Sequence, residues 1–302
     1  MKTEQLIKNF KLFWQYPAIT EKTFYEQEKN NELFIGFPWA TVHDQRTNLN
    51  VVYNKILPLI DRNKKYYTCC QHIHFYKFIS LWKALGITVV YASHKIKGQD
   101  NINGIDIKPC PLYAVNYKDP LRNSIFQNKD FLNIERKLLY SFIGGYQPAD
   151  YMSNIRPKIF SLPHTKDCFV KNTGIWHFDG LVFTEKQNLN YELNTNRTHE
   201  QKTEEYNKIL LNSRYSLCPS GSGPNSIRFW EALAVGSIPV LLSDKLELPK
   251  HELWDKAIVQ MKEEEIAKIR DVLNTISLDK EREMRENCLK IYDYFKDNYK
   301  TE

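Results

Sequence analysis

Residues 215–244 constrain the fold more strongly than any other part of this sequence. They read YSLCPSGSGPNSIRFWEALAVGSIPVLLSD, in which two short apolar runs flank a segment with apolar residues at helical spacing. The turn at 220–226 contains two glycines, one proline and three serines, a composition typical of a turn that opens into a helix. The pattern predicts a β-α-β unit, with Pro224 at the first helical position and Gly236 at the end of the helix.

The start of this predicted helix suits a phosphate group, because unpaired backbone amides and the positive end of the helix dipole meet there. A P-loop needs a lysine directly after the glycines, and this turn has none. The fragment Gly221-Ser-Gly223-Pro-Asn-Ser226 keeps two of the three small positions of a dinucleotide-binding fingerprint, and Asp244 follows about 20 residues later. A nicotinamide-dependent oxidoreductase is therefore one alternative.

Arg228 and Glu231 favour a different ligand. Arg228 lies in the first turn of the predicted helix and can face a diphosphate as a delocalised cation. Glu231 lies one turn further on, where its carboxylate can reach the hydroxyl pair of a ribose. The sequence therefore predicts a nucleoside diphosphate lying over the helix, although a solvated helix face would also explain Glu231 taken alone.

Residues 218–244 strongly resemble the signature of the exostosin-like glycosyltransferases, glycosyltransferase family 47. In that family a Cys-Pro-x-Gly turn, a Gly-Pro-x-x-x-Arg-x-Trp-Glu-Ala helix and an Ile-Pro-Val strand ending in Ser-Asp form the nucleotide-sugar site. Weaker resemblance extends to residues 37–44, 70–75 and 139–145, with Arg156 after the last of these. The pattern is most similar to short microbial or viral members, because no extra domain is present.

The resemblance implies an inverting glycosyltransferase that moves a sugar from a UDP-sugar to a hydroxyl of a glycan. The sugar could be xylose, galactose, glucuronate or N-acetylglucosamine, since a contact with one or two hydroxyls decides between them. A non-catalytic glycan-binding protein with a vestigial donor site is a second alternative. The residues expected to bind the donor are Ser220, Gly221, Ser222, Gly223, Pro224, Asn225, Ser226, Arg228, Glu231, Arg156 and Gly144.

Strands and helices alternate along the chain, which predicts an α/β fold with parallel sheets. Together with the resemblance, this predicts the GT-B arrangement of two Rossmann-like domains with a cleft between them. The expected boundaries are 1–130 for the acceptor-binding domain and 131–302 for the nucleotide-sugar-binding domain, whose last helix could cross back onto the first. Strands are expected at 33–37, 66–70, 87–92, 105–107, 137–143, 181–184, 215–218, 238–242 and 257–259, and helices at 49–60, 75–85, 151–160, 204–211, 263–275 and 278–297.

A general base is expected from the first domain, opposite the donor. Asp44 is the first candidate, with His43 beside it, because the pair follows the predicted first strand and because related inverting transferases commonly use a carboxylate. A polar loop or a helix cap is the plainer explanation of both residues. Gln71, His72 and His94 are expected to contact the acceptor. His72, His74 and His94 share one edge of the sheet, so a zinc site or a buried structural role are also open.

The remaining composition limits cofactors and partners. No D-x-D triplet occurs, so metal-independent transfer is expected, with backbone amides and arginines neutralising the diphosphate. A formal charge of +6 is mild for 302 residues and does not by itself imply nucleic acid. Six scattered cysteines indicate free thiols. The first residues lack a signal-peptide core, so a cytoplasmic enzyme of a bacterial or virus-infected cell is expected, without a transmembrane segment but with peripheral membrane contact allowed.

Overall fold

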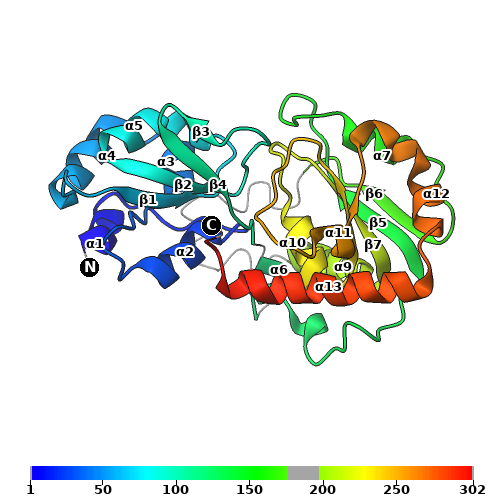
Figure 1. The fold of residues 1–302 in the computed structure, drawn as a ribbon. Helices are drawn as coiled ribbons and strands as arrows, with labels where there is room; N and C mark the ends of the chain where they lie inside the picture. The colour runs from blue at the N-terminus through cyan, green and yellow to red at the C-terminus, as the bar shows by residue number, and fades with distance from the viewer. Residues whose placement is uncertain (1, 114, 121, 176–196, 301–302) are drawn as a thin grey trace.

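The protein contains two mainly parallel β-sheets that lie side by side, each covered by helices (Figure 1). The computed structural model describes residues 2–113, 115–120, 122–175 and 197–300. Strands and helices alternate through both sheets, which confirms the predicted α/β class. The predicted strand at 181–184 lies outside the described residues.

The first sheet has the strand order β1-β2-β4-β3. β1, β2 and β4 are parallel, and β3 pairs antiparallel with β4. Its strands are β1 (Tyr66–Cys70), β2 (Ile87–Ala92), β3 (Asn101–Ile102) and β4 (Ile105–Pro109). The helices of this half are α1 (Lys2–Asn9), α2 (Thr20–Glu28), α3 (Trp39–Asp44), α4 (Leu49–Ile56) and α5 (Ile79–Ala84). The predictions for β1 and β2 are confirmed in full, whereas β3 was not predicted.

The predicted strand at 33–37 is wrong as a full strand. The segment makes an isolated parallel bridge, from Phe34 to Tyr67 of β1. Two backbone hydrogen bonds hold it: Ile35 donates to the carbonyl of Tyr67 at 2.9 Å, and Tyr67 donates to the carbonyl of Leu33 at 3.0 Å. The segment then turns into α3 at Trp39, so the pairing ends before a ladder can form.

The second sheet has the order β6-β5-β7-β8-β9, and all of its pairings are parallel. Its strands are β5 (Leu138–Gly144), β6 (Cys168–Asn172), β7 (Ser213–Pro219), β8 (Ile238–Leu242) and β9 (Val259–Gln260). The helices are α6 (Val115–Lys118), α7 (Ile155–Ser161), α9 (Arg197–Asn212), α10 (Ile227–Ala234), α11 (Trp254–Ala257), α12 (Ile269–Asn274) and α13 (Leu278–Asp297). The edge strand β6 was not predicted, and α7 begins four residues later than expected.

The predicted β-α-β unit is present as β7, α10 and β8, but Pro224 is not at its first helical position. The helix begins at Ile227, after Ser226 in an extended conformation. The turn is longer than expected because Gly221 donates to the carbonyl of Gly223, which closes a tight loop before the helix. Gly236 follows the end of α10, as predicted, with a φ of 65° that favours glycine.

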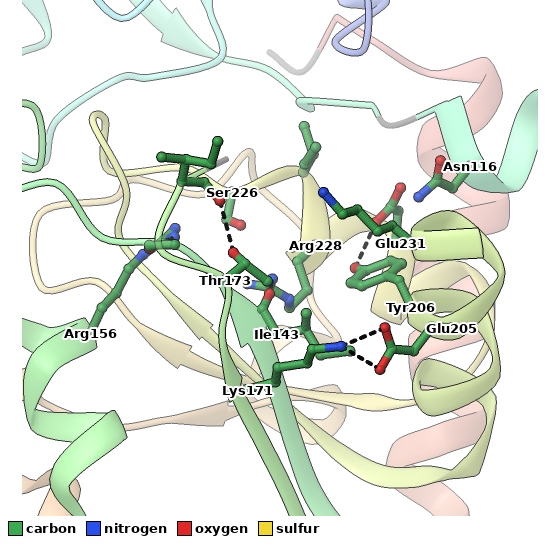
Figure 2. Close-up of a pocket in the computed structure, with 15 residues that line it drawn as sticks. Asn116, Ile143, Arg156, Lys171, Thr173, Glu205, Tyr206, Ser226, Arg228 and Glu231 are labelled. Atoms are coloured by element: carbon green, nitrogen blue, oxygen red, sulfur yellow. Dashed lines mark hydrogen bonds and ion pairs between the residues drawn. The ribbon is translucent and has the colours of Figure 1, made fainter. Parts of the chain in front are cut away.

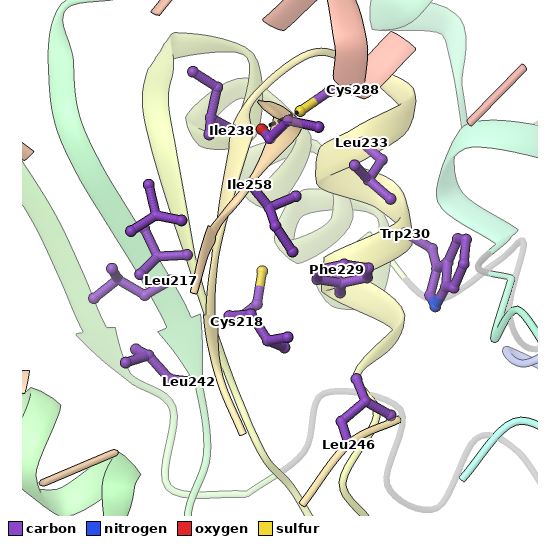
Figure 3. Close-up of a cluster of buried hydrophobic side chains, with 14 of the residues drawn as sticks. Leu217, Cys218, Phe229, Trp230, Leu233, Ile238, Leu242, Leu246, Ile258 and Cys288 are labelled. Atoms are coloured by element: carbon purple, nitrogen blue, oxygen red, sulfur yellow. Dashed lines mark hydrogen bonds between the residues drawn. The ribbon is translucent and has the colours of Figure 1, made fainter. Parts of the chain in front are cut away.

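The helix α10 is buried on nearly all sides. Phe229, Trp230 and Leu233 are fully buried and belong to the same apolar cluster as β7, β8 and α13. Figure 3 shows Phe229 facing the strands and Trp230 on the opposite side of the helix, with Cys218 and Cys288 in the same cluster. All six cysteines are free, which confirms that prediction. A helix buried this completely has little freedom to shift, so its first turn is held in one place.

Residues 95–97 and 245–247 join the two halves of the molecule. An antiparallel bridge links Ile96 to Leu246, and Glu247 donates a backbone hydrogen bond to the carbonyl of Lys95 at 3.2 Å. The side chain of Lys95 is almost completely buried and pairs with the carboxylates of Asp100 and Glu247. The two sheets are therefore held together by paired backbone and by a buried ammonium group.

The end of the chain also reaches the first half. α13 runs along the second half toward the first (Figure 1). Tyr299 packs against Phe24 of α2 at 5.7 Å and against Tyr113 at 4.9 Å. Lys300 forms an ion pair with Glu28 at 2.7 Å. Tyr299 and Lys300 thus contact α2, and Tyr299 also contacts the segment that follows β4.

Replacing Trp230 by alanine should destabilise the protein strongly. The indole is fully buried against Tyr113 and Phe295 and donates to Asn225, so its loss should lower the free energy of unfolding by about 3–5 kcal/mol. Urea titration followed by far-UV circular dichroism measures this. The control Leu278→Ala removes a side chain that is 75% exposed and should change the same free energy by less than about 0.5 kcal/mol. Equal effects of the two variants would contradict the assigned core.

Candidate active site

A cavity of about 270 Å³ lies at the start of α10. It brings together five of the residues predicted to bind the donor, from β5, α7 and α10: Gly144, Arg156, Ser226, Arg228 and Glu231. Its wall also includes Lys171 and Thr173 near the end of β6 and Tyr206 from α9. Ser226 makes no capping hydrogen bond to the helix, so the first amides of α10 remain free of a side-chain cap. The cavity can therefore hold an anionic group at a helix N-terminus.

Two guanidinium groups provide positive charge here. Arg156 donates to the carbonyls of Ser220 and Gly145, at 3.0 and 2.9 Å. Arg228 donates to the carbonyl of Ile143 and lies over the ring of Phe142. Within the described residues neither arginine has a carboxylate partner, and burial, followed by the charge of Arg228, lowers the pKa of Arg156 to about 10. Two adjacent cations without anionic partners favour a phosphate-bearing ligand.

Glu231 lies deeper in the same cavity and is only 4% exposed. Its Oε2 accepts a hydrogen bond of 2.7 Å from the hydroxyl of Tyr206, and Figure 2 shows this pair beside Arg228. Burial raises the pKa of Glu231 to about 7, although Tyr206 and Arg228 act in the opposite direction. A carboxylate has acceptor positions beyond those used by Tyr206 and the backbone of Asn116, so Glu231 can accept a further hydrogen bond, such as one from a sugar hydroxyl. Sequence reasoning missed Tyr206, because no motif links it to Glu231.

A larger cavity of about 580 Å³ lies between the two sheets. It contacts the turn before α10 on one side and the first sheet on the other. The predicted residues that line it are Asp44, Gln71, His72, His94, Arg156, Gly221, Ser222, Gly223, Asn225 and Ser226. His43, Ser220 and Pro224 line neither cavity. Gln15, His74 and Tyr151 line it as well, and Gln15 and Tyr151 were not predicted.

Asp44 ends α3 and is surrounded by hydrogen-bond donors. Its Oδ1 lies 3.1 Å from a ring nitrogen of His43 and 3.1 Å from one of His72, while Gln15 donates to Oδ2. Burial raises the pKa of Asp44, but the hydrogen bond and charge of His72, with those of Gln15 and His43, outweigh it and lower the pKa. Asp44 is therefore ionised at neutral pH and faces the cavity.

Gln71 uses its side chain mainly to hold α2. Its amide oxygen accepts from the backbone of Glu21 at 2.9 Å, and its amide nitrogen donates to the carbonyl of Ala18 at 2.8 Å. Glu21 in turn accepts from the backbone amides of Gln71 and Ala40. Burial raises the pKa of Glu21 to about 8. The hydrogen bonds that its carboxyl group accepts in this network come from backbone amides. It fixes the start of α3 and so the position of Asp44.

His94 lies where the first sheet meets the turn before α10. A methyl group added at Gly223 would lie 2.5 Å from its Nδ1, which shows how closely the turn approaches the ring. That nitrogen is buried and has no hydrogen-bond partner among the described residues. Burial, followed by the charge of His72, lowers the pKa of His94 to about 3, so the ring is neutral. Next to it, Asn225 donates to the carbonyl of Ser93 at 2.7 Å.

One group of side chains has the geometry to hold a metal ion. A ring nitrogen from each of His43, His72 and His74 lies within 4.8 Å of the others, and no further group of this kind occurs in the described part of the chain. The sequence allows His72, His74 and His94 as an alternative zinc site; the structure groups His72 and His74 with His43 instead. Among the described helices, none has the length and apolar composition needed to cross a membrane.

Comparisons with known proteins identify the family. Residues 80–276 match the model of the exostosin GT47 domain. The chain is 28% identical over 189 residues to an exostosin-1 homolog of Caenorhabditis elegans, covering 61% of this chain and 48% of that protein. It is 27% identical over 203 residues to exostosin-1 of Drosophila melanogaster, covering 64% and 25%. A probable glucuronosyltransferase of Oryza sativa subsp. japonica is 34% identical over 76 residues, covering 24% and 18%.

The chain thus spans less than half the length of each of these relatives. The matched region includes both strands and the helix of the β7-α10-β8 unit, and with them Arg156, Arg228 and Glu231. Since the family model covers well over half of the chain, the protein belongs to the exostosin GT47 family of glycosyltransferase domains.

Proposed function

We propose that this protein is an inverting glycosyltransferase that moves a sugar from a UDP-sugar to a hydroxyl of a glycan. The observation that carries the proposal is the grouping of Arg156, Arg228 and Glu231 around one cavity at the start of α10. The family membership supports a sugar donor and a glycan acceptor and favours transfer over the oxidoreductase and binding-protein alternatives. The rice relative is named a glucuronosyltransferase, which places glucuronate among the sugars to test, beside xylose, galactose and N-acetylglucosamine.

The proposed arrangement is of the GT-B type. The first sheet, in residues 1–130, would form the acceptor domain, and the second, in residues 131–302, the donor domain. One apolar cluster lies entirely in the first half, and the other is centred on the second sheet although it also includes Cys69 and Tyr91 of the first. The larger cavity lies between the sheets, which supports this division. Ligands of such parallel sheets bind beyond the carboxyl ends of the strands, and both β5 and β7 end at the cavities.

The donor would place its diphosphate against the first amides of α10 and the two arginines. These groups would stabilise the negative charge that develops on the leaving UDP, so no metal ion is required at the diphosphate. Glu231 would accept hydrogen bonds from the ribose hydroxyls, with Tyr206 fixing the orientation of its carboxylate. The turn at 220–226 would hold the transferred sugar toward the larger cavity.

The acceptor would enter from the first sheet, with Asp44 as the general base. The acceptor hydroxyl gives its proton to the Asp44 carboxylate as its oxygen attacks the anomeric carbon. The bond from that carbon to the phosphate oxygen breaks, and UDP leaves with the electron pair. A single displacement of this kind inverts the anomeric configuration. Gln15, His43 and His72 hold the carboxylate in place, which is the positioning that such a step needs.

The affinity for a UDP-sugar should increase with pH through Glu231. Its pKa is raised to about 7, so the carboxyl is mostly protonated at pH 6 and mostly ionised at pH 8. If the ribose binds the ionised form, affinity should rise about tenfold between these values. Isothermal titration calorimetry with the tightest-binding UDP-sugar of a panel measures this, since the diphosphate of a UDP-sugar does not itself titrate in this range.

Two variants test the assignment to Glu231. Glu231→Gln should weaken binding at pH 8 and remove the pH dependence. The control Glu205→Gln alters a carboxylate on the wall of the same cavity, paired with Lys171, and should keep the pH dependence. An affinity that stays constant with pH in the unmodified protein, or an unchanged profile in Glu231→Gln, would show that Glu231 does not contact the ribose.

Arg228→Ala should weaken UDP binding by about 10–100-fold, the loss expected for charge-assisted hydrogen bonds to a phosphate. Binding of uridine, which has no phosphate, should stay unchanged when followed by ligand-detected NMR. The control Arg282→Ala removes an exposed arginine of α13 that contacts Asn133 and should affect neither ligand. Equal losses for UDP and uridine would mean that Arg228 shapes the cavity rather than binding the diphosphate.

Asp44→Asn should lower turnover by about 10²–10⁴-fold while leaving UDP-sugar affinity within about twofold, because the amide cannot take a proton. Asp150→Asn is a matched control, since Asp150 lines the same cavity without the histidine contacts. Release of UDP in the presence of an acceptor gives the rate, and calorimetry gives the affinity. Turnover retained in Asp44→Asn would remove this residue as the base.

A further inference from the structure

His43, His72 and His74 form a compact group, called here the histidine cluster. Their ring centroids lie 4.1 Å apart for His43 and His72, 5.1 Å for His43 and His74, and 5.3 Å for His72 and His74. One ring nitrogen of each lies within 4.8 Å of one nitrogen of each other ring. Three imidazoles this close together cannot all be positively charged without mutual repulsion. Their grouping is therefore not explained as a set of charged histidines.

Two separate parts of the first half build the cluster. His43 lies in the last turn of α3, whereas His72 and His74 follow β1. The backbone amide of His74 donates to Nδ1 of His72 at 3.0 Å, which fixes these two rings relative to each other. Phe78 lies beneath His43, with ring centroids 6.3 Å apart. The arrangement is therefore held by both backbone and apolar contacts.

Asp44 orients two of the three rings. Its Oδ1 lies 3.1 Å from Nδ1 of His43 and 3.1 Å from Nε2 of His72. Metal-binding histidines commonly have their second ring nitrogen held by a carboxylate, as Nδ1 of His43 is held here. In His72 the other nitrogen, Nδ1, accepts the backbone amide of His74, so this ring must exchange one of its two contacts for the metal ion. His74 contributes an Nδ1 that is buried and has no hydrogen-bond partner among the described residues. A buried imidazole nitrogen that has no partner among the described residues and faces two oriented imidazoles is available to bind a metal ion.

The positive charge of Lys77 opposes metal binding by the histidine cluster, and removing this charge provides a test. Its ammonium lies 3.3 Å from Nε2 of His43, where a metal ion would be repelled. The contact is exposed to solvent, so the lysine can rotate away at little cost. Its presence means that a metal ion and the Lys77 ammonium compete for the same position.

We propose that His43, His72 and His74 bind one divalent cation of the zinc class on the acceptor side of the cleft. Imidazole ligands favour zinc, copper and nickel, whereas magnesium, calcium and manganese prefer oxygen. Ligand atoms of a zinc site lie roughly 2.0–2.1 Å from the metal, so the rings must close slightly by side-chain rotation. His72 and His74 line the larger cavity, which leaves a fourth position open toward water or a substrate oxygen. The site is separate from the diphosphate and does not depend on the proposed sugar transfer.

Equilibrium titration of the purified, chelator-treated chain with Zn²⁺ alone tests the proposal. The expected result is one equivalent bound, with affinity reduced by at least about tenfold in His74→Ala and in His72→Ala. Lys77→Ala should bind Zn²⁺ about fivefold more tightly, because a neighbouring positive charge is removed. His251→Ala is the matched control, since this histidine packs against Tyr294 and Phe295 in the second half and its loss should not alter binding. Titration with Co²⁺ gives an independent readout through the intense visible absorption of a tetrahedral site.

Circular dichroism and melting temperature without metal establish that each variant is folded. Should His72→Ala fail to fold, His74→Ala and Lys77→Ala still decide the question. Zn²⁺ binding that is equally weak in the unmodified protein and in His74→Ala would overturn the proposal. So would a Zn²⁺ affinity that does not increase in Lys77→Ala, since the cation would then lie elsewhere.

Discussion

The burial of α10 is the constraint on which the candidate site depends. Phe229, Trp230 and Leu233 fix this helix between the second sheet and α13. Arg228 and Glu231 belong to the same short helix, so their positions follow from the packing of their apolar neighbours. The helix therefore supplies free amides, a cation and a carboxylate to one cavity with little conformational entropy left to lose when a ligand binds.

The chemistry of the two cavities differs in a way that matches their proposed roles. The cavity at α10 carries two guanidinium groups that form no ion pair within the described part of the chain, and a carboxyl whose burial raises its pKa to about 7. The cavity between the sheets is lined instead by imidazoles and by an ionised Asp44, whose pKa is lowered by its donors. This difference supports the proposal that the two cavities bind different partners of a transfer reaction.

The sequence predicted the parts of the fold in which local pattern and packing agree. β1, β2, β8 and α13 have their predicted bounds because apolar runs and helical spacing leave few alternatives. The hairpin of β3 and β4 was missed although Asn103-Gly104 is a typical two-residue turn, with φ values of 53° and 89°. The late start of α10 and the contact of Tyr206 with Glu231 depend on tertiary interactions, which no spacing in the sequence encodes. The same holds for His43, which joins His72 and His74 only through the folding of α3 onto β1.

The paired segments at 95–97 and 245–247 have a mechanical consequence. They lie directly after His94 and Asp244, and the Asn225 contact with Ser93 is beside them. The first-sheet wall of the larger cavity and the turn before α10 are therefore both attached to these paired segments. Any movement of one sheet relative to the other is therefore restrained at these segments, and also where Tyr299 and Lys300 contact α2. The walls of the larger cavity consequently cannot separate freely at either of these two places.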